Sequence, residues 1–439
     1  MTSGASQPDG GDEPRDRFIP VRKTDILRAL IDRGRLRPGE AEQFRQFGRL
    51  LGAIYHYEYF DRLETLRNDY YHFNPDLPHD TAVDPQILAR AHDELVATLI
   101  GVLTKADFVE VMPDDLARSH KERHVLNVEV ELPAGDYREV RFFRRGEHRE
   151  TVEISEWLGL RKRSIEVEVY DHLVLMVMIK PAGEIMSPRL ARHLAKNRLR
   201  PGTILIKYFR DIARSDLNML FPNVRVVMSL FDKLFLGLPA LAGGIPILIK
   251  LVPAITVLAL VIAAWLGVAG TTQRDETKEA LAAVSALVAL GGFLMRQWLK
   301  YQRQSLKYQK EIADNVYFRN INNNAGVFDY IIGTAEEQEC KEAFLAYYFL
   351  ASAGTPLTQA ELEGEIEQWL KETFRVDVEF EVAEALAKLE RLKLLRRDGE
   401  ALAVPSLDDA LAILDRAWMD FFPLRTDPAP RTDPAPPSS

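Results

Sequence analysis

The sequence has very little cysteine and no excess of positive charge. Cys340 is the single cysteine among 439 residues, which excludes an internal disulfide and suits a reducing compartment. A free cysteine is more often a small buried apolar side chain than a nucleophile. The formal net charge of -9 provides no basic footprint for a polyanion. General nucleic-acid binding is therefore not expected.

Signatures of known chemistry are also missing. The sequence has no Gly-rich phosphate loop, no GxSxG elbow and no HExxH pair. The polar stretch at 1–15 resembles neither a secretory signal nor an Arg-rich transit peptide. Like 423–439, with its short repeat TDPAP, it is predicted to be a disordered tail. We therefore predict no catalytic, cofactor-binding or metal-binding residue and no cofactor, although an enzyme without a known motif stays open.

Three groups of polar residues have spacings that sometimes mark a site. His120 and His124 have the i, i+4 spacing of a helical metal pair, but no third ligand is near them, which favours solvated surface. The second group, His56, Glu58, Asp61 and His72, is interpreted as packing and surface charge. The third group consists of Lys207, Asp211 and Asp216, and its aspartates are interpreted as helix caps.

Two long apolar runs dominate the middle of the chain. Residues 251–270 carry no charge and reach the roughly 20 residues that a helix needs to cross a bilayer. Residues 280–299 form a second run, in which Arg296 and Trp298 suit the interface. The connection 271–279 is short, so the two runs predict a transmembrane hairpin. Lys and Arg flank its outer ends, which predicts that both termini are cytoplasmic.

Lys250 precedes the first run and has two interpretations. As a boundary residue it would extend its ammonium to the headgroups, with 234–250 lying in the interface. Alternatively it lines an ion or substrate path at membrane depth. Small residues at helical spacing predict tight hairpin packing or a homo-oligomer, although abundant alanine explains them equally well. These residues are Ala259, Ala263 and Gly267, Ala282 with Ala286, and Ser285 with Ala289.

The chain before the apolar runs shows two periodicities. A helical period in 16–116 predicts an N-terminal helical bundle, with Thr24 capping its first helix and another helix after Pro85. A period of two in 117–233 predicts a mixed or antiparallel β domain, which contains a buried strand at 173–179. Its strands are expected at 124–132, 138–143, 149–154, 165–179, 203–208 and 224–228.

The chain after the runs reads as a helical connector, 300–353, and a winged-helix-like module, 354–422. In the module, Thr358 and Glu361 form a capping box, and Asp398-Gly399 suits a hairpin turn. Between 356 and 404, twelve acidic residues oppose seven basic ones, which favours contact with a protein over DNA. The DNA interpretation rests on a local basic cluster of Lys388, Arg391, Lys393, Arg396 and Arg397.

Several ordered blocks resemble a known family. They include RFIP near the start, YDHLVLMVMIK, PGTILIKYFRDIARSDLNMLFPNVRVVM, NNNAGVFDYIIGTAEEQECKEAFLAYYFL and VDVEFEVAEALAKLERLKLL. These blocks are similar to the domain-of-unknown-function 3754 family, which includes transmembrane-protein-143-like members. The resemblance covers about 16–422 and implies a two-span membrane protein. The family has no established activity, so the resemblance implies no site residue.

Together these features predict an α+β integral membrane protein in the bacterial inner membrane. Its parts would be an N-terminal helical bundle, a mixed or antiparallel β domain, a two-helix transmembrane hairpin and a C-terminal winged-helix-like module. The predicted function is a membrane-anchored scaffold or interaction protein. The predicted partners are the lipid bilayer and a protein bound by the C-terminal module, with a homo-oligomer as a further option. The alternatives are an oligomeric transport or channel component and a membrane-proximal lipid-modifying enzyme.

Overall fold

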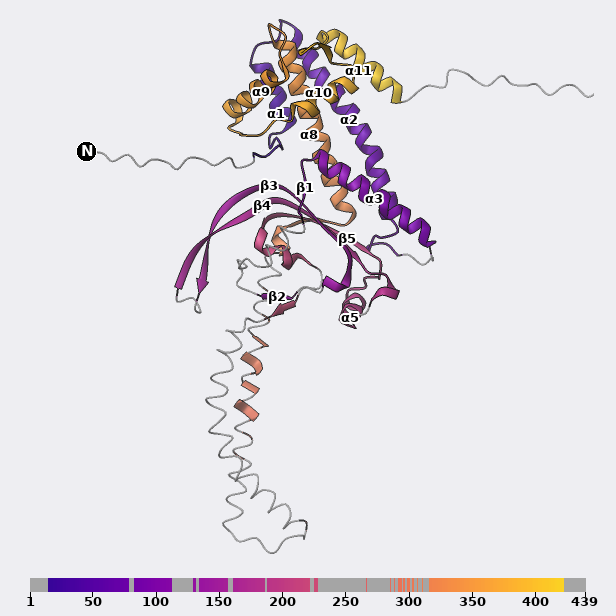
Figure 1. Cartoon of the computed structure of the whole chain (residues 1–439), viewed down its shortest axis with the longest axis vertical. Coiled ribbons are helices and arrows are strands. Elements are labelled where there is room, and N and C mark those ends of the chain that lie inside the picture. Colours follow the sequence, from indigo (N-terminus) through magenta and orange to yellow (C-terminus); the bar gives the residue numbers. More distant parts are fainter. Residues whose placement is uncertain are drawn as a thin grey trace, which may run out of the picture.

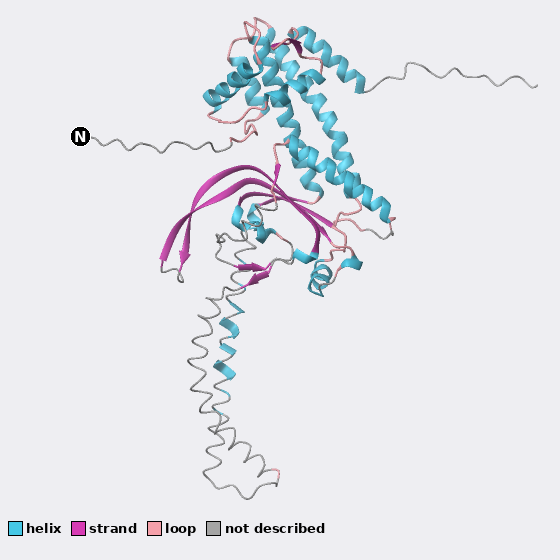
Figure 2. Cartoon of the chain, viewed as in Figure 1, coloured by secondary structure: helices cyan, strands magenta, loops and turns pink. Residues whose placement is uncertain are grey.

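The computed structural model combines a helical body with a curved antiparallel sheet. In Figure 1 and Figure 2 the labelled helices other than α5 gather on one side of the sheet. The structure describes residues 15–78, 83–112, 129–131, 134–156, 161–185, 188–221, 225–227 and 316–421, with single residues between 266 and 310.

The helical body is built from both ends of the chain. α2 and α3 pack on each other and on α8, and α11 packs along α2. One hydrophobic core runs through all seven helices, although almost 220 residues separate the two groups in sequence. The helices are α1 (Lys23–Asp32), α2 (Glu40–Tyr70), α3 (Pro85–Lys105), α8 (Ala325–Ser352), α9 (Gln359–Phe374), α10 (Val382–Arg391) and α11 (Leu407–Phe421).

α8 is the central helix of this body. Every side chain from Gln338 to Leu350 is buried, which is the pattern of a helix covered on all sides. Aromatic rings of α2 stack on it, with 4.2 Å between the ring centroids of Phe47 and Tyr347. The buried hydroxyl of Tyr348 donates to the carbonyl oxygen of Leu30 at 2.7 Å. α8 therefore holds the N-terminal and C-terminal helices together.

The main sheet has five antiparallel strands in the order β1-β3-β4-β5-β7. Val174 and Met176 of β4 belong to the core shared with the helices, while Leu173 and Leu175 belong to a second core on the opposite face. The strands are β1 (Val109–Glu110), β3 (Tyr137–Glu156), β4 (Arg161–Ile179), β5 (Ile204–Ala213) and β7 (Asn320–Asn323). Elsewhere β2 (Glu129–Glu131) pairs with β6 (Arg225–Val227), and α5 spans Pro188–Asn197.

Several local predictions are confirmed. α3 begins at Pro85, and the side chain of Asp84 caps it by accepting from the backbone N–H of Gln86 at 2.9 Å. The capping box of Thr358 and Glu361 is present at the start of α9. β8 (Arg396–Asp398) and β9 (Ala401–Ala403) form the expected hairpin.

Two other local predictions are wrong. Thr24 does not cap the first helix, because α1 already begins at Lys23 and has no side-chain cap. The strands expected at 138–143 and 149–154 are one continuous strand, β3. Gly146 lies between the two expected segments with a φ of 67°, which a glycine adopts without strain, so the chain continues.

The predicted integral membrane fold and its location in the inner membrane are corrected by the structure. Among the described residues, no helix combines the length and the apolar character needed to cross a bilayer. The first predicted span, 251–270, lies outside the described residues except for Leu266, and only separate residues of 280–299 are described. The described structure therefore gives no support to the membrane assignment or to the bilayer as a partner.

Other predictions also fall on residues that the structure does not describe. They concern the tails, apart from Arg15, the interfacial segment 234–250 with Lys250, the loop 271–279, and the pair His120 and His124.

Candidate functional site

The middle of α8 holds four polar side chains in a stretch that is otherwise apolar. Gln338, Glu339, Lys341 and Glu342 are each no more than 6 % exposed. Burial of an ionised group is costly unless the group is paired, so their partners decide what they do. These partners come from α10, α3, β3 and the N-terminal segment, defined here as residues 15–21.

Lys388 of α10 supplies the main counter-charge. Together with Glu339, Glu342, Glu384 and Lys105 it forms a group that we call the Lys388 cluster. Nζ of Lys388 lies 2.9 Å from Oε1 of Glu339 and also donates to Glu342. Oε2 of Glu384 lies 3.9 Å from the same Nζ and accepts from Lys105 at 2.8 Å. Burial alone would lower the pKa of Lys388, but Glu342 and Glu339 outweigh it and raise that pKa. Burial raises the pKa of Glu342.

The carboxylates of the Lys388 cluster have the spacing of a metal site. Glu339, Glu342 and Glu384 each offer an oxygen atom, and these atoms lie within 4.8 Å of one another. The ammonium of Lys388 already lies against all three carboxylates. A divalent cation would have to displace it against charge repulsion. The geometry therefore favours an internal salt bridge over a metal centre.

The N-terminal segment crosses α8 next to this cluster. Oε1 of Gln338 accepts from the backbone N–H of Ile19 at 3.2 Å, and Nε2 of Gln338 donates to the carbonyl oxygen of Arg17 at 3.3 Å. Nζ of Lys341 donates to the carbonyl oxygen of Ile19 at 2.5 Å. α8 thus satisfies the backbone of an extended segment that has no strand partner among the described residues.

Phe18 lies between two buried cations. Nζ of Lys341 lies 4.5 Å from the centroid of its ring, and the guanidinium of Arg145 lies 3.8 Å from it. Cation–π attraction is strongest where water is excluded, as it is here. Burial lowers the pKa of Lys341 to about 8 and also lowers the pKa of Arg145. Because Arg145 belongs to β3, this contact joins the sheet to the helical body.

The acidic residues of the C-terminal module face the N-terminal segment. Arg15 pairs with Glu367 of α9 at 2.8 Å, and Arg17 pairs with Glu381. Part of the negative charge counted in the sequence is therefore neutralised within the chain.

Asp107 lies where α3 leads into β1, in a left-handed conformation with a φ of 60°. Its Oδ2 is buried and has no hydrogen-bond partner among the described residues. Burial raises its pKa to about 8, and the nearby carboxylates of Glu342 and Glu381 act in the same direction. The folded protein therefore favours the neutral acid.

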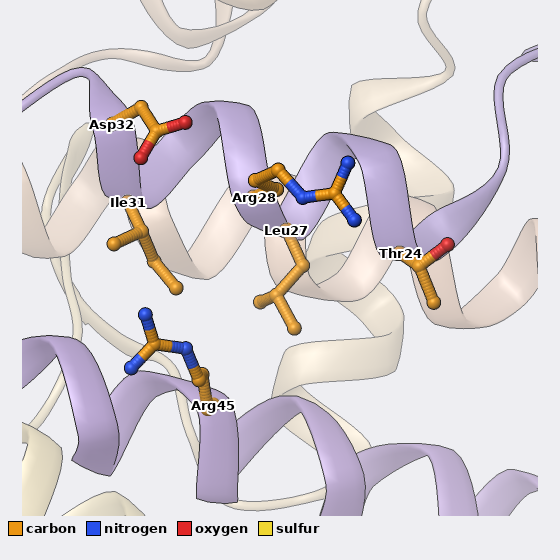
Figure 3. A pocket seen from close by; sticks show the side chains of 6 residues that line it. All are labelled: Thr24, Leu27, Arg28, Ile31, Asp32 and Arg45. Atoms are coloured by element: carbon orange, nitrogen blue, oxygen red, sulfur yellow. The ribbon is translucent and has the colours of Figure 1, made fainter.

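Two hollows open on the helical body. A cavity of about 560 Å³, which we call the α8-end cavity, lies where α8 ends, between the α1–α2 loop and the start of α11. A smaller groove of about 240 Å³ lies between α1 and α2. In Figure 3, Leu27 and Ile31 point from α1 toward α2, and Arg45 points back toward α1. The groove is smaller than the roughly 300–1,000 Å³ of most ligand pockets, whereas the cavity lies within that range.

The candidates in the aromatic stretch at the end of α2 each contact a different residue. Nδ1 of His56 lies 2.9 Å from Oε2 of Glu336, while Glu58 pairs with Arg391. The carbonyl oxygen of Asp61 accepts from Thr65, and the ring of His72 lies 5.6 Å from that of Tyr71. The four candidates, His56, Glu58, Asp61 and His72, thus have separate partners.

The third candidate group, Lys207, Asp211 and Asp216, is spread over β5 and the 3₁₀ helix η3 (Arg214–Leu220). Lys207 lies in β5, where burial lowers its pKa. Asp211 is also in β5 and has a φ of 53°, so its interpretation as a helix cap is wrong. Asp216 is buried in the first turn of η3.

The sequence analysis missed the buried charges of α8. Their signal lies in EEQECKEAFLAYYFL, where a charged segment leads directly into an apolar one without a turn residue. A helix that carries charges into a core needs internal counter-ions. The identity of these counter-ions has no signature in the sequence.

Part of the chain matches a known protein family. The family described as "Protein of unknown function (DUF3754)" matches residues 170–326, from β4 to the first residues of α8. No solved structure matches the chain. The matched residues include no side chain of the Lys388 cluster and none that lines the α8-end cavity.

Proposed function

We propose that this chain binds another protein through the end of α11. The proposal rests on the surface of the chain itself, because the family that residues 170–326 match is described only as a protein of unknown function. One observation carries the proposal. Aromatic and methionine side chains gather where α11 ends beside α2, in a group that we call the α11 patch. Tyr57, Trp418 and Phe421 contact one another, and the patch is completed by two exposed neighbours along the same helices, Phe60 of α2 and Met419 of α11.

The rings of the α11 patch form a compact group. Ring centroids of Tyr57 and Phe421 lie 4.7 Å apart, and those of Tyr57 and Trp418 lie 6.3 Å apart with an edge-on orientation. Phe60, one turn further along α2, is 49 % exposed, and Met419 is 63 % exposed. Aromatic residues and methionine are enriched at protein interfaces, where large apolar side chains lose the most water.

Polar residues border the patch. Asp415, Arg416 and Asp420 are exposed on the same helix. An apolar centre with a polar rim is the usual arrangement of a transient protein interface. The proposed partner is therefore a protein that presents an apolar segment to the patch.

DNA binding by the C-terminal module has weaker support. α10 is the helix that would enter a DNA groove, and its two cations are Lys388 and Arg391. Lys388 is buried against α8, and Arg391 pairs with Glu58. Both are occupied by carboxylates, whereas phosphate binding needs cations that are free to contact the backbone of the nucleic acid.

The test compares two surface variants of the full chain. Phe60→Ser with Met419→Ser removes the two most exposed apolar side chains of the patch, and Asp415→Ser with Arg416→Ser alters the polar residues beside it as a matched control. Cross-linking in the producing cells followed by mass spectrometry identifies the proteins attached to each variant. We expect at least one protein to be lost from the patch variant and kept by the control. Identical sets of proteins for the two variants would contradict the proposal.

Self-association is a separate outcome of the same test. Light scattering of the purified wild-type chain measures its mass in solution. A dimer that the patch variant abolishes would identify a second copy as the occupant and would overturn the proposal of a different partner.

A further inference from the structure

The α8-end cavity is surrounded by three parts of the chain that are distant in sequence. Its walls come from the α1–α2 loop with the start of α2, from the last residues of α8 with the loop that follows, and from the stretch between β9 and the first residue of α11. Such a convergence of loops on a rigid core is typical of binding sites. A volume of about 560 Å³ admits a small organic molecule.

The rim of the cavity carries two arginines from the α1–α2 loop. Arg37 is exposed, and its guanidinium has no partner among the described side chains. Arg35 is 3.8 Å from Glu365, a long contact between half-exposed groups that contributes little. Both guanidinium groups can thus donate hydrogen bonds to a carboxylate or a phosphate, whose oxygen atoms fit the planar fork of arginine.

The acidic residues at this rim are already engaged. Oε2 of Glu40, which lines the cavity, accepts from the backbone N–H of Arg37 at 2.8 Å. Asp409, behind the rim, accepts from the hydroxyl of Ser406 at 2.7 Å. These carboxylates stabilise the starts of α2 and α11. With two arginines against one glutamate among the lining residues, the cavity has a positive balance.

Aromatic and apolar side chains form part of the inner wall of the cavity. Phe44 and Tyr347 contribute to it, together with Leu402 from β9.

From these features we infer that the α8-end cavity binds a small organic anion with an apolar body. The carboxylate or phosphate group would contact Arg35 and Arg37, and the apolar body would lie toward Phe44 and Leu402. The inference is independent of the α11 patch, because the cavity lies at the start of α11 and the patch lies at its end.

Three probes of similar shape test the charge requirement on the full chain. Benzoate and phenyl phosphate carry the two candidate anionic groups, and benzyl alcohol is neutral. Saturation-transfer NMR detects binding, and titration gives each Kd. We expect the anions to bind at least about tenfold more tightly than benzyl alcohol, because a hydrogen bond to a charged group is worth about that much. The tighter of the two anions identifies the natural head group.

Paired variants locate the site. Arg35→Gln with Arg37→Gln is expected to weaken anion binding at least about tenfold. Arg45→Gln with Arg28→Gln makes the same change of charge in the α1–α2 groove and serves as the control, with unchanged binding expected. Equal loss in both variants, binding of benzyl alcohol as tight as that of the anions, or no binding of either anion at millimolar concentration would overturn the inference. The melting temperature of each variant confirms that it is folded.

Discussion

The ammonium of Lys388 lies 2.9 Å from Oε1 of Glu339, and the two side chains are only 6 % and 8 % exposed. This contact joins α10 to the central helix of the body. A buried ion pair gives little net stability when it forms, since both charges lose water. Removing one partner is much more costly, because the other charge stays buried without compensation.

Lys388→Met is therefore expected to lower the free energy of unfolding by about 3–5 kcal/mol. Arg397→Met is the matched control, because Arg397 pairs with Glu390 where both side chains are 45 % exposed. That change is expected to cost no more than about 1 kcal/mol. Urea unfolding of both variants measures the difference. Adding Glu342→Gln to Lys388→Met should recover part of the loss, and equal costs for the buried and exposed pairs would refute the assignment.

Asp107 is expected to make stability depend on pH. Burial raises its pKa to about 8 in the folded protein, from an ordinary value of 3.8. Between these values the folded state keeps a proton that the unfolded state releases, so stability falls as the pH rises. The stability of the wild type relative to Asp107→Asn should thus decrease from pH 5 to pH 8, as measured by urea unfolding at each pH. Asp32→Asn on α1 controls for the loss of a carboxyl group, and parallel profiles for wild type and Asp107→Asn would contradict the prediction.

Gly146 in β3 is expected to tolerate no side chain. Its φ is 67°, and an added Cβ would overlap the side chain of Asp171. Gly146→Ala should lower the free energy of unfolding by roughly 2–4 kcal/mol through backbone strain and overlap. Gly101→Ala in α3, where a Cβ meets nothing within 4 Å, should instead raise it by up to about 1 kcal/mol. Thermal unfolding distinguishes the two, and a neutral Gly146→Ala would show that the strand adjusts.

The N-terminal segment is expected to contribute directly to the core. Ile19 is fully buried against the helical body, so Ile19→Ala should cost about 2–5 kcal/mol. Ile87→Ala, at a side chain that is 53 % exposed, should change stability by no more than about 0.5 kcal/mol. Hydrogen exchange should also show faster exchange in α8 of the Ile19 variant. Unchanged exchange there would mean that the segment is not coupled to the central helix.

Local features were the most accessible from the sequence. The capping box of Thr358 and Glu361, the start of α3 at Pro85 and the hairpin turn at Asp398 depend on residues within about four positions of one another. The strand at 173–179 was also recognisable, because a short apolar run of β-branched and aliphatic residues suits a buried strand. In these places the interactions that decide the structure are contained in the segment itself.

Predictions that relied on the surroundings of a segment were less successful. The apolar runs at 251–270 and 280–299 indicated membrane spans by length, yet among the described residues no helix meets the requirements for crossing a bilayer. Length and hydropathy describe a run in isolation. Asp211 was interpreted as a helix cap, although pairing with β4 and β7 keeps its segment in a strand.

The amino-acid order alone indicated several of the helices and strands, the capping box of α9, the β8–β9 hairpin and the resemblance to the DUF3754 family, but not α5 or α11. Tertiary structure decided which charges are buried and what they contact: Lys341 meets the carbonyl of Ile19 across 322 positions, and Arg391 meets Glu58 across 333. A charged residue at the surface and one in a core look the same in sequence, because the cost of burial is offset by partners that only folding brings close. For the same reason the α8-end cavity, built from three distant segments, has no counterpart in any local pattern.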